Sequence, residues 1–292
     1  MLFLSQRLKL MMLIFSNQKS GPLAKEVAAG VCVELGKIEK KIFPDGEIYI
    51  RLLTSVKGKE VALIHTTKDN DDLVELILVL SALKDNGASF ITCVVPHLLY
   101  QRQDSAFEEG EAVSAKVVLK LIDKFADEII IVNAHFLEKA GKAKFGGVKV
   151  TNLDAFPLLG RHFKGVAQRI FSPDEGSMHY AAAAAKELGC LYDHLVKKRI
   201  DGETVEMQPK ELSVEGMNVV ILDDVIATGG TMVKAAEMLK KQGAKKVYLG
   251  CVHGVFTNGW DIFRGVDVVC TDSLPTKVSK VSLAPILIDA LK

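Results

Sequence analysis

Residues 218–250 read NVVILDDVIATGGTMVKAAEMLKKQGAKKVYLG and indicate the fold of the chain most clearly. This stretch opens with a continuous apolar run at 219–222, which is typical of a parallel strand covered on both faces. Two carboxylates, Asp223 and Asp224, end this predicted strand. A loop follows, and the apolar residues beyond it recur at helical spacing as far as Gly243, where a new strand begins. The stretch is therefore predicted to be a strand–helix–strand unit of a parallel sheet.

The loop between this strand and helix has the composition of an anion site. It consists of Ala227, Thr228, Gly229, Gly230 and Thr231. Such a turn lets successive backbone N–H groups point into one concavity, with the positive end of the helix dipole behind it. Because the preceding carboxylates would repel a bare phosphate, we expect them to bind sugar hydroxyls or magnesium. The predicted ligand is a phosphorylated sugar, and the alternative is an ordinary turn in which a threonine caps the helix.

Composition limits the classes of function that the chain can have. Its 292 residues are 49% hydrophobic, which is enough for two domains with sizeable cores. The 37 basic and 36 acidic residues give a net charge of +1, so there is no overall field for nucleic acid. No window approaches the roughly 20 apolar residues that a membrane span needs. We therefore predict no nucleic-acid partner, no membrane contact and a cytoplasmic location.

The five cysteines are widely spaced and form no CxxC pair. They are Cys32, Cys93, Cys190, Cys251 and Cys270. Their odd number and apolar surroundings predict reduced thiols in the core of a cytoplasmic protein. Because none has a partner close by in the sequence, a catalytic or metal-binding role is not favoured. At the N-terminus, residues 1–10 are interpreted as a possible extension, since translation from Met11 or Met12 would also give a chain that begins with the first strand.

The rest of the chain alternates strands and helices in the same manner, and the pattern begins again near residue 165. The expected strands are 11–15, 61–65, 90–95, 128–132, 168–171, 219–222, 247–252 and 267–270, and the expected helices are 21–35, 71–86, 112–125, 178–188, 231–242 and 283–291. The predicted fold class is α/β, with two similar doubly wound parallel-sheet domains. We place them at 11–158 and 159–282, with 283–292 as an optional part of the first.

Polar residues follow several predicted strands at their carboxyl ends, where open α/β sheets bind ligands. Arg102 and Gln103 follow one strand of the first half, and His135 follows the next. Asp174 follows the first strand of the second half. Taken alone, the Arg–Gln pair is explained as well by a solvated loop as by a ligand site. A lone histidine is more often structural, and an aspartate at a helix start is more often a cap.

Two further polar segments lie in predicted turns or loops. FPDGE, at 43–47, taken alone is best explained as a hairpin turn that uses the backbone freedom of Gly46. The basic triplet from Lys197 to Arg199 lies in a polar stretch, where three cations in a loop usually mean a solvated surface.

Taken together in this order, the segments resemble the ribose-phosphate diphosphokinases, or phosphoribosyl diphosphate (PRPP) synthetases, and most closely the compact archaeal-type members. The acidic pair and glycine loop resemble the PRPP motif that these enzymes share with type I phosphoribosyltransferases. FPDGE resembles a synthetase segment that the transferases lack, and the resemblance covers nearly the whole chain from about Met12. Three positions depart from the pattern: Ala227 replaces Asp, Ser or Thr, His97 replaces an aromatic residue, and Ser105 replaces a basic one.

The resemblance implies two phosphoribosyltransferase-type domains and a defined reaction. The enzyme would transfer the diphosphoryl group of Mg-ATP to the anomeric hydroxyl of ribose 5-phosphate, giving PRPP and AMP for nucleotide biosynthesis. It implies Mg²⁺ as cofactor, ATP and ribose 5-phosphate as partners, and a homo-oligomer in which a neighbouring subunit completes the ATP pocket. The alternatives are a catalytically silent regulatory subunit of this kind and a phosphoribosyltransferase that uses PRPP.

The resemblance also assigns roles to residues of this chain. Lys197 and Arg199 would be catalytic, at the tip of a mobile loop. The implied ATP-binding residues are Phe43, Asp45, Gly46, Glu47, Arg102 and Gln103. The implied ribose 5-phosphate residues are Arg199, Asp223, Asp224, Ala227, Thr228, Gly229, Gly230 and Thr231. His135 and Asp174 would hold the metal. The chain has no GxxxxGK[ST] loop, so ATP would be held by side chains and magnesium.

Overall fold

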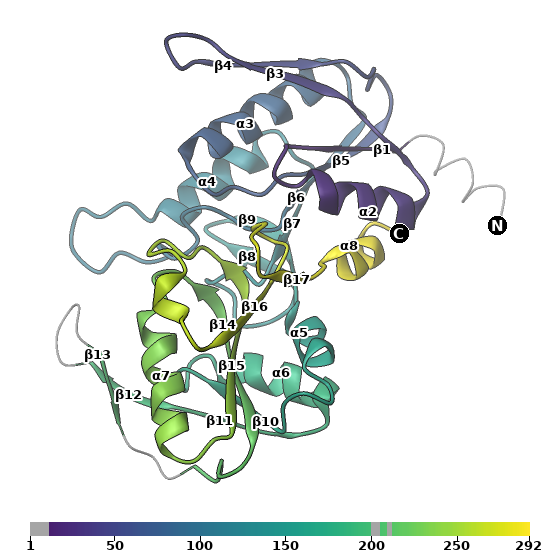
Figure 1. Cartoon of the computed structure of the whole chain (residues 1–292). Coiled ribbons are helices and arrows are strands. Elements are labelled where there is room, and N and C mark those ends of the chain that lie inside the picture. Colours follow the sequence, from purple (N-terminus) through teal and green to yellow (C-terminus); the bar gives the residue numbers. More distant parts are fainter. Residues whose placement is uncertain (1–11, 200–204, 209–211) are drawn as a thin grey trace. The chain divides into compact units, whose positions relative to one another are not determined.

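The structure is a computed structural model that describes residues 12–199, 205–208 and 212–292, with the backbone alone for 196–199 and 205–208 (Figure 1). The interpretation of residues 1–10 as an extension therefore lies outside the described residues. The chain divides into two compact units. The first ends at Asp154 and also includes Leu283–Lys292, and the second is Ala155–Ser282.

The first unit is a seven-stranded sheet with helices on both faces. Its strand order is β2-β1-β5-β6-β7-β9-β8, parallel except for the β8–β9 pair. The strands are β1 (Met12–Ser16), β2 (Glu34–Leu35), β5 (Glu60–Ile64), β6 (Phe90–Val95), β7 (Glu128–Val132), β8 (Gly141–Phe145) and β9 (Val148–Leu153). The helices are α2 (Gly21–Val31), α3 (Asn70–Asp85), α4 (Ser114–Asp123) and α8 (Ala284–Ala290). A separate hairpin pairs β3 (Ile38–Ile42) with β4 (Ile48–Leu52).

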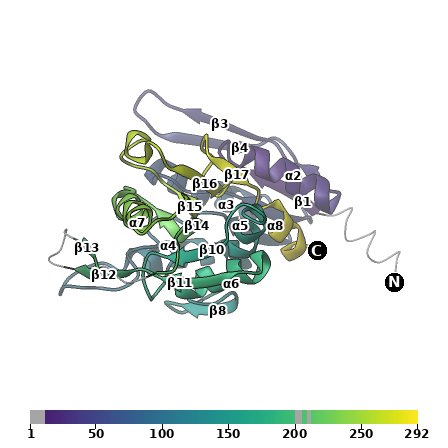
Figure 2. The same cartoon turned by 60° about the horizontal axis from the view of Figure 1, so that its bottom comes forward.

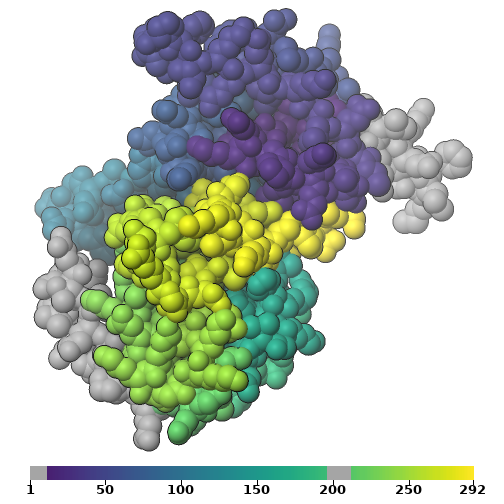
Figure 3. Space-filling view, in the orientation of Figure 1, coloured from purple at the N-terminus to yellow at the C-terminus, as the bar shows by residue number. Residues whose placement is uncertain are grey.

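Local sequence explains how the helices of this unit begin and pack. Helix α3 begins with a capping box in which the Asp69 carboxylate accepts the N–H of Asp72 at 3.0 Å, which satisfies a donor of the first turn. Helices α3 and α4 cover one face of the sheet and share its main apolar cluster. Helix α8, at the yellow end of the chain, lies against α2, in purple (Figures 1 and 3). Gly30 permits this contact, because a Cβ there would lie 2.2 Å from the Ile288 side chain.

The second unit is a six-stranded, wholly parallel sheet in the order β11-β10-β14-β15-β16-β17. The strands are β10 (Arg169–Ser172), β11 (Leu191–His194), β14 (Asn218–Ile226), β15 (Lys246–Gly254), β16 (Asp267–Thr271) and β17 (Ser279–Val281). The helices are α5 (Phe156–His162), α6 (Met178–Leu188), α7 (Gly230–Lys241) and the 3₁₀ turn η1 (Asp261–Phe263). A hairpin pairs β12 (Val196–Arg199) with β13 (Val205–Gln208).

Alternate residues of β14 supply the two faces of this second sheet. Val219 and Ile221 belong to the apolar cluster that α7 covers, whereas Leu222 lies on the other face, beside Gly250. Figures 1 and 2 show α7 on one face and α5 and α6 on the other. Both faces of the strand are thus buried, which is why its sequence is a continuous apolar run. The predicted α/β class with two doubly wound parallel sheets is confirmed.

Several predicted boundaries were wrong for identifiable reasons. The helix predicted at 21–35 ends at Val31, because Cys32 adopts a left-handed conformation (φ 60°) and the chain then enters β2. The strand predicted at 219–222 continues to Ile226, so it contains both carboxylates instead of stopping before them. The basic triplet predicted in a loop lies in strand β12. Of the five cysteines predicted in the core, Cys32 is exposed and Cys190 is only partly buried, so neither is a core residue. None of the helices in the described part of the chain combines the length and apolar composition that crossing a bilayer requires.

Candidate active site

The carboxyl edge of the second sheet brings together three predicted site residues. Strands β10 and β14 are parallel neighbours, with Phe171 opposite Ile221, so the residues that follow them emerge at one edge. Asp174 follows β10, and the pair Asp223 and Asp224 lies near the carboxyl end of β14. These side chains supply oxygen atoms at a single edge of one sheet.

Local backbone contacts orient the acidic pair. A carboxylate oxygen of Asp223 accepts the N–H of Asp224 at 3.0 Å, and a carboxylate oxygen of Asp224 accepts the N–H of Val225 at 2.7 Å. Asp224 is buried, with 5% of its surface exposed, while Asp223 is half-buried. Strand β14 remains in the sheet beyond them, since Val225 is paired with His253. The two carboxylates are therefore held by a regular strand.

The loop that follows has the conformation expected of an anion cradle. Its backbone is anchored at Ala227, whose carbonyl accepts the N–H of Thr257 at 2.9 Å. Gly229 is the N-cap of α7 in a left-handed conformation (φ 87°), and a Cβ on it would lie 2.3 Å from the Phe263 ring. A Cβ on Gly230, by contrast, would meet nothing within 4 Å. A helix N-terminus with open space beside its first residue suits an anionic ligand.

No side chain in the described part of the chain caps α7. Since the N-cap is Gly229, the alternative interpretation in which Thr228 or Thr231 serves as the N-cap does not hold. Both threonines remain candidates to bind a ligand.

Asp174 is not the cap that its position first suggested, because the N-cap of α6 is Ser177 and no side chain among the described residues caps that helix. One of its carboxylate oxygens accepts the N–H of Ser177 at 3.0 Å and the Ser177 hydroxyl at 2.9 Å, just before α6. Its backbone carbonyl accepts the hydroxyl of Ser172 at 2.7 Å. These contacts fix the carboxylate at the sheet edge. Within the described ranges, no three His, Cys, Asp or Glu side chains are gathered as a preformed metal site.

In the first unit, one buried glutamine connects two predicted ATP-side segments. Strands β6 and β7 are parallel neighbours, and the segment after β6 contains Gln101, which is 2% exposed. Its side-chain oxygen accepts the backbone N–H of His135, after β7, at 3.1 Å. Its Nε2 atom is buried and has no hydrogen-bond partner in the described part of the molecule. The structure therefore places His135 beside the segment that carries Arg102 and Gln103.

Sequence reasoning missed the residues that shape the His135 loop. Asn133 has a left-handed backbone (φ 39°), and its side chain donates to Asp154 at 3.1 Å. The Asn152 side-chain oxygen accepts the N–H of Ala134 at 2.9 Å. No short motif identifies these partners, because they lie 18 to 21 residues away, Asn152 on β9 and Asp154 just after it.

The exposed residues that were predicted to bind ATP differ in how firmly they are held. Gln103 accepts the Ser114 hydroxyl at 2.7 Å, which fixes its side chain at the start of α4. Arg102 is exposed. In the Phe43–Glu47 turn, the N–H of Phe43 donates to the carbonyl of Glu47 at 2.8 Å. This turn is exposed at the tip of the β3–β4 hairpin, so it does not lie on the edge of the main sheet.

The predicted catalytic pair is described by its backbone alone. Lys197 and Arg199 lie in β12, where they pair with Met207 and Val205 of the antiparallel strand β13. The positions of their side chains lie outside the described part of the structure. The pair is carried by a two-stranded hairpin of the second unit.

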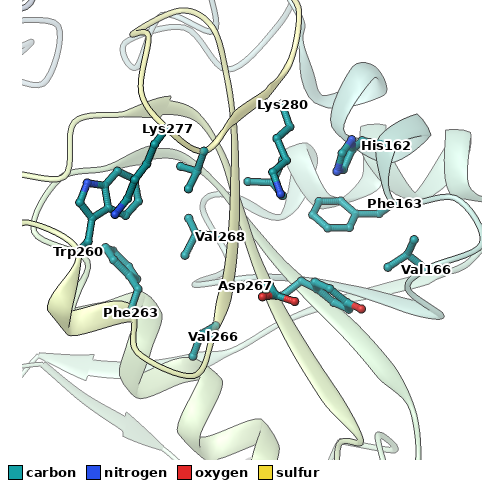
Figure 4. A pocket seen from close by; sticks show the side chains of 13 residues that line it. His162, Phe163, Val166, Trp260, Phe263, Val266, Asp267, Val268, Lys277 and Lys280 are labelled. Carbon is teal, nitrogen blue, oxygen red and sulfur yellow. The ribbon is translucent and has the colours of Figure 1, made fainter.

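A hollow of the second unit shares the Phe263 side chain with the glycine loop, but none of its lining residues is a predicted site residue. It has a volume of about 420 Å³ and is lined by Trp260, Lys277 and Lys280, among others (Figure 4). Tyr248 and Asp267, near the amino ends of β15 and β16, also line it. Since the acidic pair and the glycine loop are at the opposite ends of the strands, we assign the hollow no part in the site.

Comparison with known proteins identifies the family. Residues 12–125 match the family described as the N-terminal domain of ribose phosphate pyrophosphokinase, and residues 162–261 match the phosphoribosyl transferase domain. A ribose-phosphate pyrophosphokinase 2 of Archaeoglobus fulgidus is 41% identical over 91% of this chain and 94% of its own length. The chain belongs to the ribose-phosphate pyrophosphokinase family. The resemblance inferred from the motifs is thus confirmed.

Other members of the family are similar over the same extent. The ribose-phosphate pyrophosphokinase of Methanopyrus kandleri is 36% identical over 96% of this chain and 99% of its own. The crystal structure of phosphoribosylpyrophosphate synthetase from Mycobacterium smegmatis matches with a TM-score of 0.79 at 28% identity. It covers 96% of this chain and 97% of that one. The similarity therefore extends over both units.

Proposed function

We propose that the protein transfers the diphosphoryl group of ATP to the anomeric hydroxyl of ribose 5-phosphate, giving PRPP and AMP. The observation that carries this proposal is the edge of the second sheet. There, an acidic pair with one buried member, Asp224, precedes a glycine loop whose Gly230 position is open, in a chain of the ribose-phosphate pyrophosphokinase family. We assign ATP to the first unit and ribose 5-phosphate to the second.

The glycine loop binds the 5-phosphate of the sugar in this proposal. The space beside Gly230 is open, and the dipole of α7 favours a dianion at this helix N-terminus. We assign the backbone N–H groups of the loop and the hydroxyls of Thr228 and Thr231 as its donors. Asp223 and Asp224 accept hydrogen bonds from the ribose hydroxyls. Ala227 has no polar side chain, so its contact with ligand is limited to its backbone. These contacts with the phosphate and the hydroxyls fix the anomeric oxygen for attack on the β-phosphorus of ATP.

On the ATP side, we assign the base to the hairpin tip and the phosphates to the sheet edge. The Phe43 ring is 46% exposed and is available to stack on an adenine, with Asp45 and Glu47 as hydrogen-bond acceptors. Arg102 and Gln103 supply donors beside the His135 loop. Because the hairpin tip extends from a sheet of its own, we propose that it serves a neighbouring subunit of a homo-oligomer.

Mg²⁺ is the cofactor in this proposal, and the candidate ligands are His135 of the first unit and Asp174 of the second. Carboxylate oxygens suit this hard cation, and the Asp174 side chain is already oriented by Ser177. A histidine is a less usual ligand, so Asp174 is the stronger candidate of the two. When bound, the ion would neutralise charge on the triphosphate and help to align it.

The residues of the chain then perform the transfer mainly by positioning and electrostatics. The anomeric oxygen attacks the β-phosphorus of ATP in line, the bond from that phosphorus to the bridging oxygen of the α-phosphate breaks, and AMP leaves. Lys197 and Arg199, on the β12–β13 hairpin, stabilise the charge that develops on the transferred group. No covalent intermediate on the protein is required.

The experiment that tests the proposal follows AMP by chromatography after incubation with ATP, Mg²⁺ and ribose 5-phosphate. We expect AMP to form only when ribose 5-phosphate is present, in equal amount to PRPP. ADP in place of AMP would contradict diphosphoryl transfer. No turnover, together with consumption of PRPP and a free base, would indicate a transferase, and binding of ATP without turnover would indicate a silent subunit.

A further inference from the structure

Two cysteines that are far apart in the sequence are direct neighbours in the second sheet. Cys251 of β15 pairs with Cys270 of β16 in register. Residues paired in this way on parallel strands point to the same face, with the strands about 4.8 Å apart. The Cα separation that a disulfide requires is usually about 4.4 to 6.8 Å. The two thiols are therefore close enough to be joined without a change in strand pairing.

The pair belongs to a row of residues that crosses the sheet next to the proposed sugar site. Asp223 of β14 pairs with Cys251, and Ser279 of β17 pairs with Cys270. The row Asp223, Cys251, Cys270, Ser279 thus runs over four adjacent strands on one face. One end of the row is a carboxylate that we assign to the ribose.

Polar neighbours make Cys270 the more reactive of the two thiols. Its sulfur lies 3.4 Å from the Ser279 hydroxyl and 3.5 Å from that of Thr276. Hydrogen bonds from Cys251 and from these hydroxyls lower the pKa of Cys270 to about 7, although burial opposes the change. Burial raises the pKa of Cys251. The site therefore contains one thiol that readily ionises beside one that stays protonated.

We propose that Cys251 and Cys270 form an oxidisable dithiol, and that its closure to a disulfide switches off the ribose 5-phosphate site. The effect on activity rests on the function proposed above, whereas formation of the bond does not. The oxidant is a peroxide. The thiolate of Cys270 attacks one peroxide oxygen, so that the O–O bond breaks and a sulfenic acid and water form. The thiol of Cys251 then displaces hydroxide from that sulfur and a second water leaves, which balances two thiols and one peroxide against one disulfide and two waters.

A chain of contacts links the dithiol to the glycine loop. A Cβ on Gly254, at the end of β15, would lie 3.0 Å from the Cys270 sulfur and 2.2 Å from the Phe256 ring. Phe256 packs edge-to-face on Phe263 at 5.5 Å, and Phe263 in turn lies directly under Gly229. Because these groups are closely packed, drawing Cys251 and Cys270 together displaces the base of the loop.

The edge of the sheet offers the oxidant a route to these buried thiols. Both cysteines are fully buried, so oxidation requires a local opening. Strand β17, which covers Cys270, is only three residues long, and its register shifts between Cys270 and Thr271. A short, irregular edge strand is a place where local opening costs little.

The test treats the full chain with hydrogen peroxide and maps disulfides by mass spectrometry, alongside the rate of AMP formation. We expect a loss of two hydrogens and a peptide crosslink between Cys251 and Cys270. We also expect kcat/KM for ribose 5-phosphate to fall at least about tenfold, since small misplacements at a site are costly, and to recover with dithiothreitol. The variants Cys251→Ala and Cys270→Ser should each resist inactivation, so either one suffices if the other fails to fold.

Cys93→Ser is the matched control, because Cys93 is equally buried but lies in the first unit. This variant should be inactivated like the wild type. Free thiols at both positions after peroxide treatment would overturn the dithiol, whatever the activity of the enzyme. A mapped disulfide with unchanged kcat/KM would overturn the switch. If peroxide inactivated Cys270→Ser as much as the wild type, the oxidation that causes inactivation would lie at another residue, and the proposal would be overturned.

Discussion

Gly229 and Gly230 are adjacent in the glycine loop but are required for different reasons. Gly229 has a left-handed backbone and lies against the Phe263 ring, so it supports the fold of the loop. Gly230 has open space where a Cβ would be, so any constraint on it comes from a ligand. This difference allows structure and binding to be tested separately within one loop.

Gly229→Ala is expected to destabilise the second unit by about 1–3 kcal/mol, because of backbone strain and the clash with Phe263. Gly230→Ala should leave the unfolding midpoint nearly unchanged but weaken ribose 5-phosphate binding, since the new methyl group occupies the proposed phosphate space. Thermal unfolding and isothermal titration check the two effects. A Gly230→Ala protein that binds the sugar normally would contradict the cradle.

Gln101 provides a second prediction at the residue scale. Gln101→Met removes the acceptor of the His135 N–H, so the loop after β7 loses its link to the Arg102 segment. We expect kcat to fall about tenfold or more, with little change in KM for ribose 5-phosphate, because that substrate is assigned to the other unit. Steady-state kinetics with each substrate varied in turn measure kcat and the two KM values separately.

Tyr100→Phe is the control for this variant. It removes a neighbouring hydrogen bond, from the Tyr100 hydroxyl to Asn70 at 2.7 Å, without touching His135. Its kinetics should stay within about twofold of the wild type, as is usual for an exposed contact. Equal losses in both variants would mean that Gln101 has no specific role.

His65 predicts a pH dependence of stability. Burial of its ring lowers the pKa to about 4, whereas the unfolded value is about 6.5. As the pH falls from 6.5 to 4, His65 becomes protonated in the unfolded chain but stays neutral in the folded chain. The free energy of unfolding therefore decreases in that window, by up to about 3 kcal/mol. Urea midpoints of the wild type and His65→Leu between pH 7.5 and 4 should diverge, and a constant difference would contradict the account.

At the residue scale, the sequence could predict which side chains lie at strand ends but not what else they contact. Asp223 and Asp224 were found from their position after an apolar run. The link between Gln101 and His135 spans 34 residues and depends on two parallel strands being neighbours. The pairing of Cys251 with Cys270 escaped prediction for the same reason. Contacts across a parallel sheet leave no local signal in the chain.

At the scale of elements, the β12–β13 hairpin carries the most specific prediction about catalysis. Replacing Lys197 and Arg199 together by Ala should abolish AMP formation, because the charge of the transferred group is no longer stabilised. Loss of a single cationic contact of this kind costs about 10³–10⁵ in kcat in other phosphoryl-transfer enzymes. Binding of ribose 5-phosphate should weaken far less, since the glycine loop still holds its phosphate.

Lys198→Ala is the matched control, because it removes one positive charge from the same strand. We expect its kcat to remain within about threefold of the wild type, as a change of general surface charge would give. Turnover by the double variant at the wild-type rate would show that the hairpin is not a catalytic element. An equal loss of kcat in Lys198→Ala would mean that the positive charge of the strand, and not the positions of Lys197 and Arg199, is what matters.

Long elements with strong periodicity were predictable, and short edge elements were not. The strands Phe90–Val95 and Glu128–Val132 and the helix Met178–Leu188 match their predicted bounds. Strands β8, β11 and β17 were missed, because these edge strands are short and carry polar residues that resemble loops. Strand β9, which lies inside the first sheet, was also missed. The basic triplet was misplaced for the same reason as the edge strands, since a polar two-stranded hairpin lacks an apolar face.

At the scale of the whole molecule, the alternation of strands and helices was enough to predict two α/β halves. It could not assign the last helix, because α8 is apolar enough to pack on either. The small residue Gly30 on α2 explains the outcome, since it admits Ile288 in the first unit. The small side of α2 at Gly30 thus explains why α8 packs in the first unit, which composition alone could not predict.

The most direct test of the central claim is phosphorus NMR of the full chain with ATP, Mg²⁺ and ribose 5-phosphate. We predict that the β- and γ-phosphorus signals of ATP disappear in step with the appearance of a diphosphate attached to C1 of the ribose, while the α-phosphorus becomes that of AMP. Loss of the γ-phosphorus alone, with ADP as product, would contradict diphosphoryl transfer to the sugar bound at the glycine loop.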